Sequence, residues 1–411
     1  MVECWLPYGK TEVYVTVNLR DLLSVAEPPK MEPTLQAKEI ILKALNEPRG
    51  KKLSELVTPD CNVAIALEGS TSPQVAVRAL AQLVEQLVNL IVPRERIVIL
   101  MANGTRERGS RELMNVIRNA EELKGVNIFE HVKGVTNLVA LGETHYKTPT
   151  QINRLYLEAK LKIAIGEVHV DPYSGFSGAH SALLPGLASF ETIEAHRRLV
   201  FKGDSKPGFV EVNPCKEDTF EFSNLVGCDM GIQLVVSQSG RLLHAFAGNL
   251  EETLGQAIYA IGASHQYTAE TGADIVIVSA GGSKWDYDLY SSTWALYGAQ
   301  RLVKKGGAII LLAECLEGLG ADSYSTLAHL EQLSELERRY ALGAEALYLL
   351  KATTAKCQVW LVSSLPQFMV VPLGLSVAKT ANEAYERALE GRRSVRTLVI
   401  PYGRSTVPSN L

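Results

Sequence analysis

Histidine, aspartate and hydroxyl side chains gather with four glycines in residues 166–186, which read GEVHVDPYSGFSGAHSALLPG. The imidazoles of His169 and His180 can exchange protons near neutral pH or ligate a transition metal, and the carboxylate of Asp171 can accept a proton. The glycines allow backbone N–H groups to approach a phosphate or carboxylate closely. An ordered connection with tight turns is the alternative, but the reactive side chains favour a ligand site.

A third histidine, His196, follows this stretch. The spacings between His169, His180 and His196 are 11 and 16 residues, which match no local zinc motif. Only the fold could bring the three rings to one site. Taken singly, each ring is more simply explained by a structural hydrogen bond, and His196 by a favourable interaction with the C-terminal end of a short helix over residues 189–196.

A second stretch with reactive side chains, residues 281–296, reads GGSKWDYDLYSSTWAL and follows a predicted strand. Its glycine pair is suited to close approach of the backbone to a ligand. Helix capping by the aspartates and core packing by the aromatic rings explain the same residues equally well. The side chains that could face a cleft are Asp286, Asp288, Tyr290, Ser291 and Trp294.

Short apolar runs alternate with helical stretches along most of the chain, which predicts parallel sheets flanked by helices in an α/β fold. An antiparallel hairpin over 233–236 and 241–247 interrupts the alternation. We therefore expect two α/β domains, residues 1–265 and 266–411, with the active-site cleft between them. The predicted strands cover residues 61–67, 96–101, 161–165, 273–279, 308–312, 358–363 and 397–401, and a helix is predicted over 290–304.

The loops that follow these strands are the expected binding positions, because ligands of open α/β sheets lie beyond the carboxyl ends of the strands. Four loops are of interest, at residues 68–73, 102–107, 166–181 and 280–290.

Composition excludes several classes of function. The 411 residues include 41 Lys and Arg against 45 Asp and Glu, a net charge of −4 that argues against bulk nucleic-acid binding. No apolar run approaches the roughly 20 residues of a membrane span, and no secretory signal is visible. The six cysteines form no CxxC pair and are typical of reduced thiols. We expect a cytoplasmic protein without nucleic-acid or membrane partners; a homo-oligomer is left open.

Common phosphate, dinucleotide and hydrolase motifs are missing. The sequence holds no GxxxxGK[ST] loop, no GxGxxG fingerprint and no HExxH pair. Residues 175–179, GFSGA, approach the G-x-S-x-G elbow, but the strand that this motif needs ends about ten residues too early. Ordinary ATP, NAD or serine-hydrolase chemistry is therefore not supported.

The order of the loops resembles the nickel-dependent lactate racemase family and its wider group of 2-hydroxyacid racemases and epimerases. Two segments are fairly specific for this family: GFSG…PG within residues 175–186, and AEC-EGLG within residues 306–320. The other motifs are weak when each is taken alone. The similar segments are STSP at 70–73, ANGTRE at 102–107, GFSGAHSALLPG at 175–186, ETIEAH at 191–196, GGSKWDYDLYSSTWAL at 281–296 and GGAIILLAECLEGLG at 306–320.

This resemblance implies two α/β domains around a nickel pincer cofactor, a pyridinium mononucleotide that binds nickel through sulfur and carbon. Members are proposed to transfer the C2 hydride of a small hydroxyacid to the cofactor and return it to either face, while protein bases handle the hydroxyl proton. His196 would ligate the nickel.

The match is incomplete at several functional positions. Ser181 replaces the lysine that tethers the cofactor, so binding would be noncovalent. Arg106 replaces the first catalytic histidine and is a poor base because it stays protonated. The second catalytic position is Asp171, with His169 two residues upstream. Ser72 replaces the substrate-binding arginine.

In the later helix Ser291 and Trp294 replace a glutamine and a lysine. Arg106 and Lys284 are the cations that could compensate, and Trp294 offers a flat face for a sugar or aromatic ring.

The expected site follows from this comparison. His169, Asp171 and Arg106 are the catalytic candidates, and His196 is the metal ligand. The cofactor-binding candidates are Thr71, Gly175, Ser177, Gly178, His180 and Ser181. The substrate-binding candidates are Ser72, Lys284, Tyr290, Ser291 and Trp294.

The function expected is a racemase or epimerase acting on a larger or less anionic hydroxyacid-like substrate. Two alternatives are a non-catalytic relative that binds a nucleotide or anionic ligand, and a different metal-dependent enzyme on the same scaffold.

Overall fold

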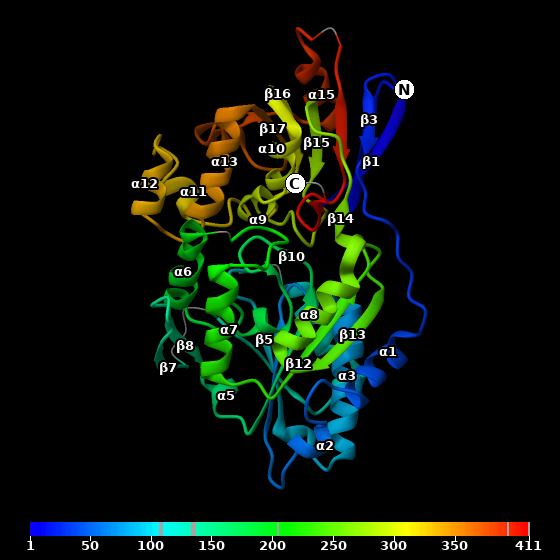
Figure 1. Ribbon diagram of the computed structural model, residues 1–411, viewed down its shortest axis with the longest axis vertical. Helices are drawn as coiled ribbons and strands as arrows, with labels where there is room; N and C mark the ends of the chain where they lie inside the picture. The colour runs from blue at the N-terminus through cyan, green and yellow to red at the C-terminus, as the bar shows by residue number, and fades with distance from the viewer. Residues whose placement is uncertain (107–109, 133–136, 204, 393, 410–411) are drawn as a thin grey trace. The chain divides into compact units, whose positions relative to one another are not determined.

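The computed structural model describes residues 1–106, 110–132, 137–203, 205–392 and 394–409 (Figure 1). The chain divides into two compact units. Unit 1 combines Met1–Pro29 with His265–Leu411, and unit 2 is Lys30–Ser264. Each unit is built around one six-stranded sheet.

The sheet of unit 2 is parallel except for one edge strand, and its order is β13-β12-β9-β4-β5-β6. Its inner strands read as continuous apolar runs because helices bury both of their faces. The strands are β4 (Val63–Glu68), β5 (Ile97–Ala102), β6 (Asn127–Glu130), β9 (Leu161–Val168), β12 (Met230–Val236) and the antiparallel β13 (Leu242–Gly248).

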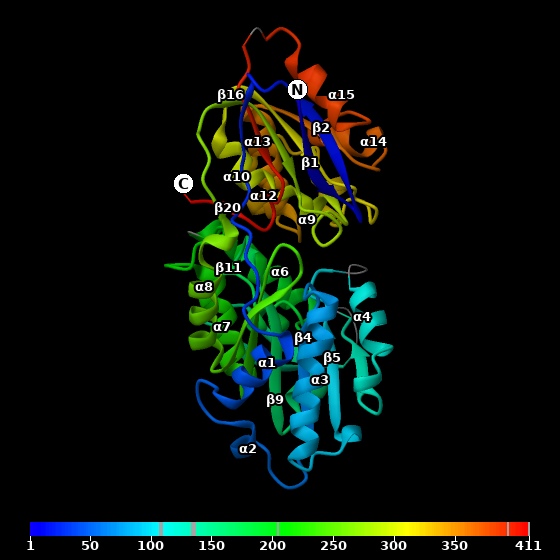
Figure 2. The same cartoon turned by 90° about the vertical axis from the view of Figure 1, so that its right-hand side faces the viewer.

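Helices lie on both faces of this sheet, as Figure 2 shows. One face shares a core with α1 (Ala37–Asn46), α2 (Leu53–Leu56), α3 (Pro73–Asn89) and α4 (Arg111–Arg118). The opposite face carries α8 (Leu250–Ile261) and the 3-10 turn η3 (Ala179–Ala182). Other strands and α-helices of unit 2 are β7 (Leu138–Glu143), β8 (Pro149–Asn153), α5 (Arg154–Leu157), β10 (Val170–Asp171), β11 (Gly175–Phe176), α6 (Phe190–Arg198) and α7 (Pro214–Val226).

The adjacent strands β4 and β9 form the topological switch point of the unit 2 sheet, the position at which the connections change from one face to the other. The chain leaves β4 into α3 on one face, and it leaves β9 towards η3 on the other. Diverging loops open a crevice at such a point, which is where ligands bind in open α/β sheets.

The sheet of unit 1 is entirely parallel, in the order β18-β17-β16-β15-β19-β3. Its strands are β3 (Leu22–Val25), β15 (Ala273–Ser279), β16 (Val303–Leu312), β17 (Gln358–Val362), β18 (Ser376–Val377) and β19 (Thr397–Ile400).

One face of this sheet packs on the hairpin of β1 (Val2–Tyr8) and β2 (Thr11–Val17) and on α15 (Ala381–Leu389), which share a core with it. The other face carries α9 (Leu289–Thr293), α10 (Leu296–Leu302) and α13 (Ala344–Lys356). Shorter elements are β14 (Gln266–Tyr267), α11 (Ser323–Thr326), α12 (Leu333–Arg338), α14 (Gln367–Val370) and β20 (Val407–Pro408).

The α/β class with two largely parallel sheets is confirmed, but two details predicted from the sequence are corrected. Residues 1–29 belong to unit 1 and not to a domain of residues 1–265, because β3 pairs with β19 and the β1–β2 hairpin covers the same sheet. The single helix predicted over 290–304 is split into α9 and α10, and Val303 already starts β16. Among the described residues, no helix is long and apolar enough to cross a membrane.

Candidate active site

The loop after β9 is held by a carboxylate-capped turn. Oδ1 of the half-buried Asp171 accepts hydrogen bonds from the backbone N–H of Tyr173 (3.0 Å) and Ser174 (2.8 Å) and from the Ser174 hydroxyl (3.0 Å). Gly175 follows with φ +83°, and a Cβ atom there would lie 2.1 Å from the Phe209 carbonyl oxygen. One oxygen of Asp171 therefore shapes the turn that carries the glycine.

His169 is fixed by a serine hydroxyl. Ser177 Oγ lies 2.8 Å from His169 Nδ1 and 3.0 Å from the Glu167 carbonyl oxygen, and it accepts a hydrogen bond from the His169 backbone N–H (3.2 Å). A carbonyl oxygen can only accept, so a hydroxyl donating to it receives the Nδ1 proton of the imidazole. In that arrangement Nε2 is the unprotonated nitrogen of His169.

Two carboxylates at the ends of β4 and β9 hold the turn of residues 70–72, which reads Ser-Thr-Ser. Glu167 Oε2 accepts from the backbone N–H (2.8 Å) and hydroxyl (2.7 Å) of Ser72, the residue before α3. Glu68 accepts from the Ser70 backbone and hydroxyl and, at 3.3 Å, from the Thr71 hydroxyl. The predicted binding residues Thr71 and Ser72 thus lie at the switch point with their hydroxyls hydrogen-bonded to carboxylates.

Arg106 lies beside this turn. Its Nη1 donates to the Gly69 carbonyl oxygen at 3.2 Å, which brings the guanidinium to the carboxyl end of β4. The last residue of the predicted loop 102–107 lies outside the described residues. The arrangement supplies positive charge, but a guanidinium does not take up a proton.

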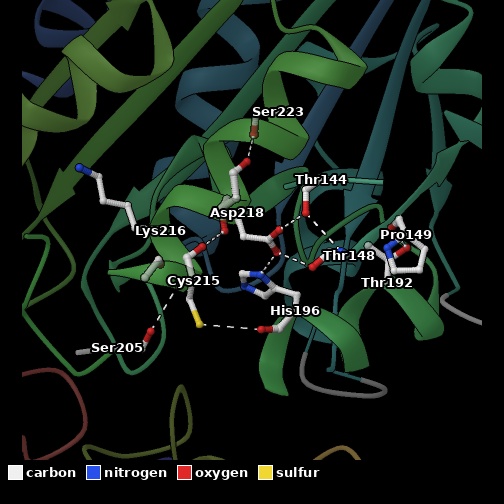
Figure 3. A network of polar contacts seen from close by, with 12 residues as sticks. Thr144, Thr148, Pro149, Thr192, His196, Ser205, Cys215, Lys216, Asp218 and Ser223 are labelled. Carbon is white, nitrogen blue, oxygen red and sulfur yellow. Dashed lines mark hydrogen bonds and ion pairs between the residues drawn. The ribbon is translucent and has the colours of Figure 1, made fainter. Parts of the chain in front are cut away.

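His196 is held in one tautomer by a buried aspartate (Figure 3). Its Nδ1 lies 2.7 Å from Oδ2 of Asp218, and the two side chains are 2 % and 0 % exposed. Asp218 also accepts from the hydroxyls of Thr144 and Thr148. The carboxylate can only accept, so Nδ1 donates and Nε2 carries the lone pair. Nε2 makes no hydrogen bond within the described part of the chain.

The helix α7 brings Asp218 to this position. Asn213 caps its first turn by accepting from the Lys216 backbone N–H, and its amide donates to the carbonyl oxygens of Tyr173 and Phe209. The side chain of Asn213 therefore links α7 to Tyr173 of the turn that Asp171 caps. Burial raises the pKa of the nearby Cys215 thiol to about 12, so this sulfur stays protonated and is a poor metal ligand.

His180 is fully buried in η3. Its Nε2 lies 3.2 Å from the Phe176 carbonyl oxygen, and its ring stacks on Phe220 with centroids 5.1 Å apart. Nδ1 has no hydrogen-bond partner within the described chain. Burial lowers the pKa of His180 to about 4; the Asp171 charge raises it, and Lys216 and His196 lower it. Asp171, Lys216 and His196 therefore lie close enough to His180 for their charges to change its pKa.

The turn that contains η3 is also held by the side chain of Gln233 and by a backbone hydrogen bond. Gly178 has φ +156°, and a Cβ atom there would meet the Gln233 side-chain oxygen at 2.3 Å; that oxygen accepts from the Ala179 N–H at 2.8 Å. Ser181 donates its backbone N–H to the Gly178 carbonyl. The four predicted cofactor-binding positions of residues 177–181 thus form a compact turn at the end of β9.

The predicted substrate-binding residues of the second stretch lie in unit 1. The hydroxyl of Tyr290 donates to Glu345 Oε1 (2.8 Å), and Ser291 donates its backbone N–H to Asp288 Oδ1 (2.7 Å) as the capping interaction of α9. Trp294 is buried, and Lys284 Nζ lies 5.2 Å from the Trp285 ring centroid. Within unit 1, Tyr290 and Ser291 therefore have structural contacts.

Asp286 of unit 1 is 1 % exposed and bonds through Oδ2 to the Gly9 backbone N–H (2.7 Å). Its Oδ1 has no partner among the described residues, and burial raises the pKa of its carboxyl. Glu314 lies near it, and burial followed by the Asp286 charge raises the Glu314 pKa as well.

Sequence reasoning missed Asp218, Glu167 and Glu68. No local pattern marks Asp218: it is 0 % exposed within α7, and its partner His196 lies 22 residues earlier. No group of three His, Cys, Asp or Glu side chains able to hold a metal occurs in the described ranges. His196 offers one oriented nitrogen, Nε2, because Asp218 holds Nδ1.

Comparisons with known proteins agree with the fold. The lactate racemase N-terminal domain family matches residues 8–208, and the lactate racemase C-terminal domain family matches residues 268–407. The lactate racemase of Thermoanaerobacterium thermosaccharolyticum is 24 % identical over 330 residues, 79 % of this chain and 77 % of that protein. The lactate racemase of Lactiplantibacillus plantarum is 25 % identical over 434 residues, 99 % of this chain and 100 % of that protein.

Solved structures are similar over nearly the whole chain. The lactate racemase apoprotein from Thermoanaerobacterium thermosaccharolyticum superposes with a TM-score of 0.85 at 22 % identity, covering 99 % of this chain and 100 % of that one. A Thermotoga maritima protein superposes with a TM-score of 0.67 at 16 % identity, covering 93 % and 99 %. Because the two domain families match consecutive parts that span most of the sequence, the chain belongs to the lactate racemase family.

Proposed function

We propose that this protein racemises or epimerises a 2-hydroxyacid with the help of a nickel pyridinium pincer mononucleotide bound noncovalently. The observation that carries the proposal is the His196–Asp218 pair, in which a buried carboxylate holds Nδ1 and leaves Nε2 as the available nitrogen. Carboxylate–histidine pairs of this kind orient metal-binding imidazoles and raise their basicity.

The donor chemistry at this position fits nickel. Imidazole nitrogen suits this metal, and a single protein nitrogen suffices where an organic group supplies the other donors. Ser181 cannot form the covalent link that a lysine makes, so the buried turn of residues 177–181 would hold the group by packing and hydrogen bonds. When bound, this group would accept a hydride from the substrate and return it.

His169 is the better candidate for the base. The Ser177 hydroxyl and the Glu167 carbonyl together fix its tautomer, with Nε2 as the nitrogen that takes the hydroxyl proton. Asp171 uses Oδ1 for three hydrogen bonds within its own turn, which supports a positioning role. Arg106 remains charged and would stabilise negative charge at the end of β4.

The free thiol state of all six cysteines supports the further proposal that the protein works in a reducing cytoplasm on a small-molecule substrate.

The test uses protein purified from a host that makes the nickel nucleotide, incubated in D₂O with a panel of single-enantiomer 2-hydroxyacids. We expect one acid to lose its stereochemical purity without deuterium at C2, because the hydride would return to the same carbon. His169→Asn should lower kcat about 100-fold or more, whereas Asp171→Asn, which preserves the acceptor of the turn, should cost less.

Two results would speak against the proposal. Interconversion with deuterium at C2 would indicate carbanion chemistry in place of hydride transfer. Binding of the nickel nucleotide without interconversion of any acid would indicate the non-catalytic relative.

A further inference from the structure

The turn between β7 and β8 places two threonine hydroxyls on the carboxylate that orients His196. Thr144 donates to Oδ1 of Asp218, and Thr148 donates to Oδ2 at 2.9 Å, the same oxygen that accepts from His196 Nδ1 (Figure 3). Both threonines are buried, and Asp218 is 0 % exposed. Three donors therefore satisfy a carboxylate that is closed off from solvent.

The backbone of this turn fixes the two hydroxyls. The Thr144 N–H donates to the Thr148 carbonyl oxygen at 3.0 Å, and the Lys147 N–H donates to the Thr144 carbonyl oxygen at 2.9 Å. Thr144 Oγ1 accepts the Thr148 backbone N–H at 3.3 Å, which leaves its own proton for the carboxylate. Since a carboxylate can only accept, both hydroxyls act as donors to Asp218.

The same turn is docked on α7, the helix that carries Asp218. The His145 backbone N–H donates to Glu221 Oε1 at 2.8 Å, and the Tyr146 hydroxyl donates to Glu217 Oε2. Both glutamates belong to α7. The two threonine hydroxyls are therefore held at a fixed position on the helix that carries the aspartate.

The strand β8 continues from the turn to α6, the helix that carries His196. The Pro149 carbonyl oxygen accepts the Thr192 hydroxyl at 2.7 Å, and the Gln151 carbonyl oxygen accepts the Ser189 N–H at 3.1 Å. Ser189 is the residue that caps α6. One short hairpin thus contacts both helices and sets the histidine and the aspartate relative to each other.

The two hydroxyls restrict rotation of the Asp218 carboxylate about its Cβ–Cγ bond. Among the described residues, its donors are Thr144, Thr148 and His196 Nδ1. Loss of one hydroxyl would leave a buried charged group short of a hydrogen bond, which is costly. The carboxylate would then turn to share the remaining donors, and the imidazole could adopt its other tautomer.

We propose that Thr144 and Thr148 are positioning residues that hold Asp218 so that His196 keeps its proton on Nδ1 and its lone pair on Nε2. The binding of nickel by this lone pair rests on the proposed function. Partners one step removed from a metal ligand fix its tautomer and ring orientation in this way. Both threonines act through Asp218 and contact neither the metal nor the substrate.

The test is NMR of the full chain without metal or cofactor, labelled with ¹⁵N-histidine. Long-range ¹H–¹⁵N spectra distinguish protonated from unprotonated ring nitrogens, and comparison with His196→Ala identifies the His196 signals among those of the eight histidines. At alkaline pH we expect a protonated Nδ1 that exchanges slowly with water, and an unprotonated Nε2. In Thr144→Val and in Thr148→Val this exchange should be about 10-fold faster or more, and the other tautomer should appear.

Thr219→Val is the matched control. It removes another buried threonine hydroxyl of α7, which donates to the Cys215 carbonyl oxygen at 2.8 Å and not to Asp218. The His196 signals should not change in this variant. Thr144→Ser and Thr148→Ser keep the donor and should retain the slow exchange, which separates the role of the hydroxyl from packing of the methyl group.

Three results would overturn the proposal: unchanged exchange and tautomer in both valine variants, serine variants that behave like the valine variants, or an equal change in Thr219→Val. If one valine variant does not fold, the other decides the outcome. Because no metal is present, failure of the chain to bind nickel or to racemise an acid leaves this result standing. Conversely, a negative result here leaves the metal-binding role of His196 to be judged by nickel content.

Discussion

The buried ring of His180 makes the free energy of unfolding depend on pH. Burial lowers its pKa to about 4, against roughly 6.5 in an unfolded chain. Between these values the unfolded chain binds more protons than the folded one, so stability is lost as the pH falls through this window. At about 1.4 kcal/mol for each unit, the loss between pH 6.5 and 5 is about 2 kcal/mol.

His180→Phe should flatten this acid dependence. Phenylalanine can still stack on Phe220 but takes up no proton. Urea unfolding at pH 7 and pH 5 measures the difference, with the exposed His244 changed to Phe as the control that should keep the natural slope. An unchanged slope in His180→Phe would show that this ring is not the group that titrates.

At the level of residues, the sequence singled out candidate side chains but not the partners that fix their orientation. His169, His180 and His196 were all predicted to belong to the site, but their different environments depend on Ser177, Phe220 and Asp218, which lie up to 40 positions away. A hydrogen-bond partner across that distance is set by packing and has no local pattern. For the same reason the hydrogen bonds that Asp171 accepts within its own turn could not be predicted from the sequence.

Among the elements, the β10–β11 turn depends on Gly175. Gly175 and Gly240 have nearly equal φ angles of +83° and +78°, but only Gly175 is crowded, because nothing lies within 4 Å of a Cβ at Gly240. Gly240→Ala should cost about 1 kcal/mol for backbone strain alone. Gly175→Ala adds a collision with the Phe209 backbone and should cost about 3 kcal/mol or more. Chemical unfolding compares the two, and equal losses would refute the crowding argument.

Element prediction succeeded at buried apolar strands and failed where a helix gives way to a strand without a break in the sequence pattern. The runs over 61–67, 96–101, 161–165 and 273–279 became β4, β5, β9 and β15. The helix expected over 290–304 is interrupted at Trp294, and its end belongs to β16, in which the exposed Lys304 and Lys305 follow the buried Val303. Val303 pairs with Ala273 of β15, and the regular pairing resumes at Ala308, which propensity alone does not show.

For the whole molecule, the boundary between the units is topological and not sequential. Residues 1–29 pair with and cover a sheet whose other strands start at residue 273, so contacts across more than 200 positions decide where they belong. The four-residue strand β3 gives no sequence signal of that partner. Fold class was therefore predictable, and the membership of the first segment was not.

Two fragments test this boundary. Residues 30–264 contain all six strands of their sheet and should fold alone with a cooperative thermal transition. Residues 265–411 lack β3 and the β1–β2 hairpin, which leaves Ile277 and Ile310 uncovered, so this fragment should aggregate. A folded, monomeric 265–411 fragment would mean that the first 29 residues are dispensable to unit 1.

The nickel content of the purified chain tests the central claim most directly. The protein should be produced in a host already shown to load a lactate racemase of known activity, and nickel should be measured per chain by mass spectrometry. We expect about one nickel in the natural chain and in the control His244→Ala, almost none in His196→Ala, and about 10- to 100-fold weaker retention in Asp218→Asn. No nickel in the natural chain, or equal nickel in His196→Ala, would contradict the account.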